Sequence, residues 1–245
     1  MPRLHCDLPL ATGAMLALPA GAARHVQVLR LQPGQTLTLF DGRGGEYDAT
    51  IEHMGRSDVR VVIGPYHAIE REATVPVHLV SAMPANERMD WLVEKITELG
   101  VQRLTPLMTE RSVLRLQGER ADKKWAHWQS VVVAASEQCG RNRLMQVDPP
   151  QTLTHWLAHD GRETTSATIL RGVLSLSPHA TPLGSLRAQT PAETPWLLVS
   201  GPEGGLSPTE EAALVAHGLM PLSLGPRVLR AETAAMAAVT RLVLA

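Results

Sequence analysis

The feature that most constrains the fold is a short apolar run that leads directly into glycines and then into a helix. The run, 196–200 (WLLVS), shows no alternation of apolar and polar residues, which is typical of a strand covered on both faces. The segment 200–205 (SGPEGG) follows, and then Ser207 stands as a candidate N-cap, with proline next and Glu210 three residues later. This order predicts a buried strand whose carboxyl end faces the start of a helix.

Similar strands alternate with helices through the rest of the second part of the chain. We predict strands at 77–83, 103–107, 168–176 and 221–224, and helices at 87–99, 123–139, 208–217 and 232–244. Such alternation favours an α/β fold with a mostly parallel sheet. The segment 181–195 is predicted to be an exposed loop.

The first seventy or so residues have a β pattern instead. We predict a short helix at 22–31 and strands at 35–40, 46–51 and 59–63, with the turn 41–45 (DGRGG) making a hairpin of the first two strands. These elements indicate a small β-barrel-like module. The polar segment 65–76 is the predicted linker to the second part.

Composition excludes several classes of protein. The chain has 245 residues, a net charge of −1 and only 3% aromatic residues, so it resembles neither a basic nucleic-acid coat nor a base-stacking platform. It has no apolar run of about 18 residues and no secretory signal. Cys6 and Cys139 are too few for a disulfide framework or a four-cysteine metal site. We therefore expect a cytoplasmic protein.

The charge is unevenly distributed despite its small total. Residues 103–143 hold eight basic residues against four acidic ones, a local excess of four positive charges. This basic segment is either a solvated helix face or a surface that contacts phosphates.

Two loops are candidates for ligand binding. Three glycines in 200–205 allow close approach of a ligand at the end of a buried strand, although an ordinary strand-to-helix turn also explains them. The segment matches neither a P-loop nor a dinucleotide fingerprint. In the second loop, 223–234, Arg230 and Glu232 lie among apolar residues and could pair with Glu203 to hold the two loops together. The ten histidines show no metal-ligand spacing, so no metal is expected.

Several segments, taken together and in order, resemble the ribosomal RNA small subunit methyltransferase E family. They are HVQVLRLQPGQTLTLFDGRG (25–44), EKITELGV (94–101), ERS (110–112), EQCGR (137–141), GPEGG (201–205) and SLGPRVLRAETA (223–234). The resemblance covers nearly the whole chain. It implies an enzyme that uses S-adenosylmethionine (SAM), without a metal, to methylate N3 of a uridine in 16S rRNA on the assembled small ribosomal subunit.

The resemblance also implies an architecture. Residues 1–72 would form a PUA-like RNA-binding domain, and 73–245 a SPOUT methyltransferase domain whose C-terminal segment is threaded into a trefoil knot. Members of the family are homodimers, and neither a membrane nor DNA is an expected partner.

The resemblance and the two loops together predict the site residues. The expected cofactor-binding residues are Gly201, Pro202, Glu203, Gly204, Gly205, Ser223, Leu224, Gly225, Val228, Leu229, Arg230 and Thr233. Arg141, Arg111 and Arg3 are candidates for contacting RNA phosphates or stabilising the charge that develops on the uridine. Glu137 or Glu203 could accept the uridine proton, and a structural ion pair explains each of them equally well.

Two departures from the family pattern stand out. Ala231 replaces a threonine, and Leu176-Ser177-Pro178 stands where relatives have Leu-His-Pro, so any role of that histidine side chain is missing here. Two alternatives stay open. One is another SPOUT methyltransferase that acts on tRNA or on a ribose hydroxyl, and the other is a non-catalytic RNA-binding or ribosome-assembly protein.

Overall fold

The computed structural model describes residues 1–55, 58–85, 87–159 and 169–244. The chain forms two compact units. The first unit combines Met1–Glu72 with Val133–Leu144, and the second combines Ala73–Val132 with Met145–Ala245. Within the described part of the chain, no helix combines the length and apolar character needed to cross a membrane.

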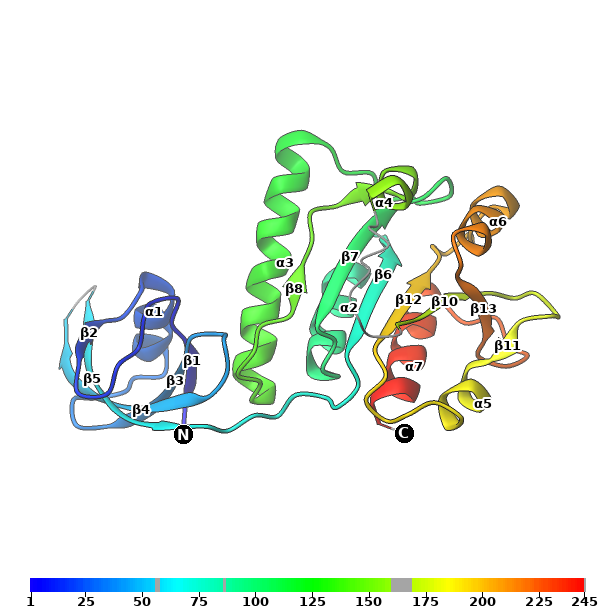
Figure 1. Cartoon of the computed structure of the whole chain (residues 1–245). Coiled ribbons are helices and arrows are strands. Elements are labelled where there is room, and N and C mark those ends of the chain that lie inside the picture. The colour runs from blue at the N-terminus through cyan, green and yellow to red at the C-terminus, as the bar shows by residue number, and fades with distance from the viewer. Residues whose placement is uncertain (56–57, 86, 160–168, 245) are drawn as a thin grey trace. The chain divides into compact units, whose positions relative to one another are not determined.

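The first unit is built on a five-stranded sheet (Figure 1). Its elements are β1 (Arg3–His5), β2 (Met15–Ala17), α1 (Ala20–Val28), β3 (Thr36–Phe40), β4 (Glu46–Met54) and β5 (Val59–His67). The strand order is β1-β3-β4-β5-β2, and only the β1–β3 pair is parallel. The predicted hairpin is confirmed as the antiparallel pair β3–β4.

The core of the first unit lies between α1 and the sheet strands. Ala23 and Val26 of α1 are buried together with Leu37 of β3, Ile51 of β4 and Val61 of β5. Alternate residues of β4 and β5 are buried, because side chains of a strand point to opposite faces of a sheet. One face of the sheet therefore supplies the apolar surface on which the short helix packs.

The second unit contains the parallel sheet (Figure 1). Its strands are β6 (Val77–Ala82), β7 (Arg103–Met108), β8 (Gln146–Val147), β9 (Gln151–Thr152), β10 (Leu170–Leu174), β11 (Thr181–Pro182), β12 (Trp196–Ser200) and β13 (Met220–Ser223). Its helices are α2 (Glu87–Glu98), α3 (Gly118–Cys139), α4 (Leu153–His159), α5 (Leu183–Ala188), α6 (Pro208–Ala216) and α7 (Ala231–Val243), although the last residues of α3 belong to the first unit.

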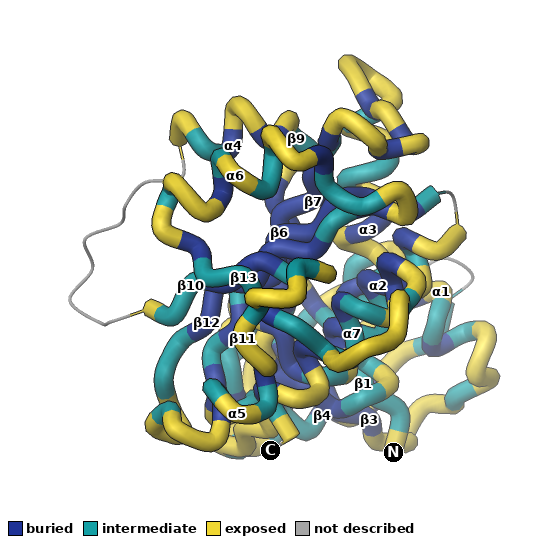
Figure 2. The backbone as a smooth tube through the Cα atoms, turned by 90° about the vertical axis from the view of Figure 1, so that its right-hand side faces the viewer, coloured by how far each residue is buried: buried dark blue, intermediate teal, exposed yellow. Residues whose placement is uncertain are grey.

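The strand order of this sheet is β11-β13-β10-β12-β6-β7-β8, with β9 also paired to β7. Every pair is parallel, which confirms the predicted α/β class. All five residues of β12 are buried, as its lack of alternation predicts. In Figure 2, β6 and β7 lie in the buried centre of this unit, and much of α4 and α6 is exposed.

The predicted helix at 87–99 is confirmed as α2. Its buried residues recur at three- and four-residue spacing and include Met89, Leu92, Val93 and Ile96. Such a stripe lets one side of the helix pack on the sheet while the charged residues remain at the surface.

Some predicted boundaries are wrong. The segment 181–195 is not a loop throughout, because it contains β11 and α5, whose Leu183 and Arg187 are buried. The predicted linker overlaps with β5, which continues to His67. Helix α1 ends three residues earlier than predicted, where the chain turns away and Arg30 adopts a φ of 54°. Thr168, the predicted start of one strand, lies outside the described residues.

Candidate active site

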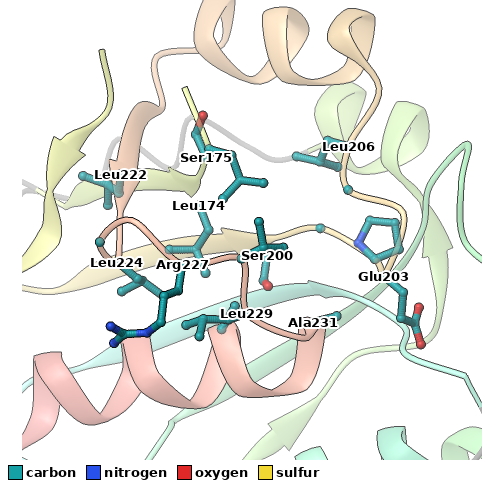
Figure 3. Close-up of a pocket in the computed structure, with 17 residues that line it drawn as sticks. Leu174, Ser175, Ser200, Glu203, Leu206, Leu222, Leu224, Arg227, Leu229 and Ala231 are labelled. Atoms are coloured by element: carbon teal, nitrogen blue, oxygen red, sulfur yellow. The ribbon is translucent and has the colours of Figure 1, made fainter. Parts of the chain in front are cut away.

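A pocket in the second unit lies at the carboxyl ends of β10, β12 and β13 (Figure 3). This edge of an open parallel sheet is where such folds bind ligands, because the connecting loops diverge there. Leu174, Leu222, Leu224 and Leu229 give the pocket apolar walls. The hydroxyl-bearing residues Ser175 and Ser200 also line it, so the pocket suits a ligand with a flat apolar part and polar groups.

The first pocket loop joins β12 to α6. Ser207 caps α6 by accepting a hydrogen bond from Glu210 N at 3.3 Å, and the Glu210 carboxylate accepts one from Ser207 N at 3.0 Å. The predicted capping box is therefore confirmed. A Cβ at Gly201 would stand 3.1 Å from Leu206 N, so the loop folds back on itself in a way that any side chain at this position would disturb.

The second pocket loop joins β13 to α7. Gly225 has a φ of +109°, which disfavours any residue with a side chain. Gly225 N donates a hydrogen bond to Ser223 Oγ at 3.1 Å. The loop then returns to Ala231, the buried first residue of α7. Both loops thus face one pocket although α6 and β13 separate them in sequence.

Eight of the twelve predicted cofactor-binding residues line this pocket. They are Gly201, Pro202, Glu203, Gly205, Leu224, Gly225, Val228 and Leu229. The other four, Gly204, Ser223, Arg230 and Thr233, lie in the same two segments but not on the pocket wall.

The sequence analysis did not identify nine further lining residues. They are Leu174, Ser175, Leu176, Ser200, Leu206, Leu222, Arg227, Ala231 and Ala234. Ser200, Arg227, Ala231 and Ala234 lie within the two candidate loop segments but were not among the predicted binding residues, and Leu206 and Leu222 stand directly beside those segments. The exceptions are the three residues at the end of β10, which contribute only because β10 lies between β12 and β13 in the sheet.

Arg111 supports the first pocket loop from the segment after β7. Its Nη1 donates a hydrogen bond to Gly204 O at 3.0 Å and a longer one to Leu206 O at 3.4 Å. The neighbouring Glu110 N donates to the Glu210 carboxylate at 2.7 Å. The ERS motif therefore contacts the first pocket loop through the Arg111 side chain, and the start of α6 through the backbone of Glu110.

The candidates Arg3, Arg141 and Glu137 lie in the first unit. The Arg141 side chain is 3% exposed and forms two hydrogen bonds with the Glu72 carboxylate, at 2.6 and 3.1 Å. Arg3 donates to the Glu46 carboxylate and, at 2.7 Å, to Asn142 Oδ1. These two arginines connect distant parts of one chain, and neither guanidinium is directed to open solvent.

Glu137 also takes part in contacts within the first unit. Its Oε1 accepts a hydrogen bond from His5 N at 2.9 Å, and its Oε2 lies 3.4 Å from His25 Nδ1. These contacts place the end of α3 against β1 and α1. These contacts give the Glu137 carboxylate a structural role within the first unit, and its role as a proton acceptor stays a prediction.

The basic segment is neutralised locally at several positions. Arg103 pairs with Asp148, Lys123 with Glu119, Lys124 with Asp90, Arg141 with Glu72 and Arg143 with Glu70. Since Arg141 and Arg143 belong to the first unit and the other basic residues of the segment to the second, the excess of charge is divided between the two units.

Among the described residues, no group of three or more histidine, cysteine or acidic residues is arranged to hold a metal ion.

Comparisons with known proteins place both units in one class. Residues 71–243 match the family model of the RNA methyltransferase domain, and residues 18–64 match that of the RNA methyltransferase PUA domain. The fold and the pocket at the ends of its parallel strands therefore define an RNA methyltransferase.

Solved structures and sequence relatives define the family more closely. A methyltransferase of Legionella pneumophila, in complex with bound SAM, is 35% identical, with a TM-score of 0.88 over 98% of this chain and 96% of that one. A ribosomal RNA small subunit methyltransferase E of Neisseria gonorrhoeae, also bound to SAM, is 30% identical, with a TM-score of 0.87 over 98% and 95%. The enzyme of that name from Mycobacterium tuberculosis is 34% identical over 228 residues, 93% of this chain and 85% of that one. The chain belongs to the ribosomal RNA small subunit methyltransferase E family, which confirms the resemblance seen in its sequence.

Proposed function

We propose that this protein transfers a methyl group from SAM to N3 of a uridine in 16S rRNA. The observation that carries the proposal is the pocket formed by the 200–207 and 223–231 loops, in a chain that shares its fold with relatives solved with SAM. The substrate follows from membership of the family.

The pocket residues fit SAM. Four leucines offer an apolar environment for an adenine ring, and the serine hydroxyls and loop backbone offer polar contacts for the ribose and the amino-acid part. Gly201 and Gly225 allow the loop backbone to approach a ligand without an intervening side chain. Bound SAM would supply an electrophilic methyl group that needs no metal.

The chain's own residues would position the two reactants. The loop backbone would hold the cofactor, and Arg111 would fix the 201–207 segment through Gly204 O and Leu206 O. Uridine N3 lies on the pairing edge of the base, so the base must be unpaired or flipped before it can enter the pocket. The N3 proton must leave before or during transfer, because the nitrogen needs its electron pair to attack the methyl group.

We propose further that the second unit is a SPOUT domain with a trefoil knot. After β13 the chain crosses from the outer part of the sheet to α7, which contacts α2, β6 and β12 nearer the centre. A knotted arrangement includes such a return of the C-terminal segment toward the centre of the sheet, and this supports the proposal. We also propose a domain boundary at residues 72 and 73, supported by a methyltransferase model that starts at residue 71 and a PUA model that ends at residue 64. In this division the segment Val133–Leu144 belongs to the second domain in sequence and packs in the first compact unit.

The working form of the enzyme is proposed from the family as well. We propose a cytoplasmic homodimer that acts on the assembled small ribosomal subunit. In this assembly the first unit, with its match to a PUA domain, would contact RNA.

The function is tested by mass spectrometry of 16S rRNA. The gene is expressed in a bacterial strain that lacks its own member of the family, and nucleosides from the purified 16S rRNA are examined for 3-methyluridine. Restored 3-methyluridine at a single site is the expected result. Methylation of tRNA or of a ribose hydroxyl would support another methyltransferase, and a purified protein that binds no SAM in calorimetry would favour a non-catalytic RNA-binding role.

A further inference from the structure

Arg88 of α2 lies between two carboxylates, one from the loop after β12 and one from the first turn of α7. Its Nη1 is 3.6 Å from Glu203 Oε1, and its Nε is 3.8 Å from Glu232 Oε1. From the sequence we predicted that Arg230 and Glu232 could pair with groups such as Glu203, but Arg230 is exposed, and Arg88 is the cation that lies beside Glu203 and Glu232.

One carboxylate belongs to the first loop of the cofactor pocket, and the other to the helix that the second loop leads into. Glu203 lines the pocket within the first loop, and Glu232 stands in the first turn of α7, directly after the second loop. Figure 3 shows Glu203 and Ala231 at the same end of the pocket. The Glu203 carboxylate is also held at the segment before α2, where it accepts a hydrogen bond from Ala85 N at 3.0 Å.

Burial makes the pairing important for Glu232. Its side chain is 9% exposed, and no hydrogen-bond partner of its buried Oε2 is found among the described residues. A buried carboxylate is costly unless a cation lies close to it. In the described part of the chain, Arg88 is the cationic side chain that lies within 4.0 Å of both carboxylates. Without Arg88, both carboxylates would lose the cation that lies within 4.0 Å of them.

We propose that Arg88 is a positioning residue that holds the two pocket loops together and thereby sets the affinity for SAM. Arg88 itself does not line the pocket, so it acts through Glu203 and Glu232. The inference rests on the proposed function, because it takes SAM to be the ligand of this pocket.

Three variants test the role. Arg88→Ala removes the cation, so the dissociation constant of SAM rises about tenfold, between the effects expected for an exposed and a buried ion pair. Arg88→Lys retains the charge but not the planar group that faces two acceptors, so its affinity lies between those of the wild type and Arg88→Ala. Combining Arg88→Ala with Glu203→Gln removes one of the opposed charges and recovers part of the affinity.

Lys95→Ala is the matched control. Lys95 is also a cation of α2 that pairs with two carboxylates, at 2.7 Å from Glu94 and 2.8 Å from Glu98, but both partners belong to its own helix. Its loss leaves the pocket loops unchanged, and SAM binding stays at the wild-type level.

The measurements are SAM titration by calorimetry on the full-length protein, the melting temperature, and kcat and KM for SAM with small ribosomal subunits. We expect Arg88→Ala to raise both the dissociation constant and the KM for SAM, and to change the melting temperature only slightly. If the wild type binds and uses SAM, and Arg88→Ala and Arg88→Lys bind it with the same dissociation constant, the role of Arg88 is overturned but the proposed function is not. A wild type that does not bind SAM overturns the proposed function and this inference together.

Discussion

Gly201 stands where the first pocket loop turns back toward Leu206, and a Cβ there would lie 3.1 Å from the backbone nitrogen of that residue. Contacts this short force the backbone to move, because the main chain cannot rotate away as a long side chain can. The sequence indicated that glycines matter in this loop, and the structure shows that Gly201 has a backbone atom as its close neighbour, whereas the nearest atom to a Cβ at Gly204 is the side-chain Cβ of Arg111 at 3.3 Å.

Gly201→Ala should therefore weaken SAM binding. Displacement of the loop lowers the affinity by about tenfold, the loss expected from overpacking at one position. Calorimetric titration with SAM measures the effect. Gly21→Ala is the control, because Gly21 lies in α1 with no atom within 4 Å of a new Cβ, and equal affinities of the two variants would contradict the account.

Arg111→Ala separates support of the loop from contact with RNA. Loss of the hydrogen bonds to Gly204 O and Leu206 O should cost about 1–2 kcal/mol of SAM binding free energy. SAM titration and the KM for small ribosomal subunits are both measured. If SAM binds normally and only the KM for the subunit rises, Arg111 contacts RNA and does not position the loop.

At the scale of elements, the sequence predicted where α6 begins but did not predict α5. The capping box of α6 depends on residues three apart, so local sequence specifies it. In α5, Arg187 Nε donates to Leu242 O near the end of α7 at 3.1 Å, and its other nitrogens bind Thr190 O and Ala192 O. The burial of Arg187 therefore depends on a hydrogen bond to a carbonyl group 55 residues away in the chain, which local sequence does not specify.

Ser207→Ala tests the capping box. Loss of the cap should lower the free energy of unfolding by about 1 kcal/mol, the usual cost at an N-cap, and urea denaturation measures it. Thr209→Ala is the control on the same helix, because Thr209 is exposed and lies beyond the cap. Equal stabilities of the two variants would show that the cap contributes nothing.

At the scale of the whole molecule, Glu46 joins three distant segments of the first unit. Its carboxylate accepts hydrogen bonds from Arg3, from Arg71 at 3.0 Å and from Asn142 at 3.1 Å. Burial by itself raises the pKa of Glu46, but the hydrogen bonds from Arg71, Asn142 and Arg3 outweigh it and lower the pKa from 4.5 to about 2.

This pKa predicts how stability depends on pH. Because the folded-state pKa lies below the unfolded value, ionised Glu46 stabilises the fold above pH 4.5, and this contribution is lost as the pH falls from 4.5 to about 2. Its full size is about 3 kcal/mol. Glu46→Gln should reduce stability near pH 7 and flatten the acid limb in chemical denaturation. Glu52→Gln, an exposed position on the same strand, should leave both unchanged.

Much of the fold could be predicted because its signals are local. Non-alternating runs predicted buried parallel strands, and the stripe from Met89 to Ile96 predicted α2. The two pocket loops were also predicted, since glycines follow a strand in each. The contribution of β10 to the pocket could not be predicted, because the order of strands in a sheet is not written in any one segment.

The sequence by itself determined the class of fold, the family and the two loops that line the pocket, because periodicity, capping residues and ordered motifs are properties of neighbouring residues. Only the tertiary structure decided what the charged residues do. In the structure, Arg3 and Arg141 form ion pairs within the first unit. Arg111 donates a hydrogen bond to the backbone of the first pocket loop, and Arg88 lies between Glu203 and Glu232. The physical reason is that a charge takes its role from the groups that folding brings within a few ångströms, and these groups lie far away in the sequence.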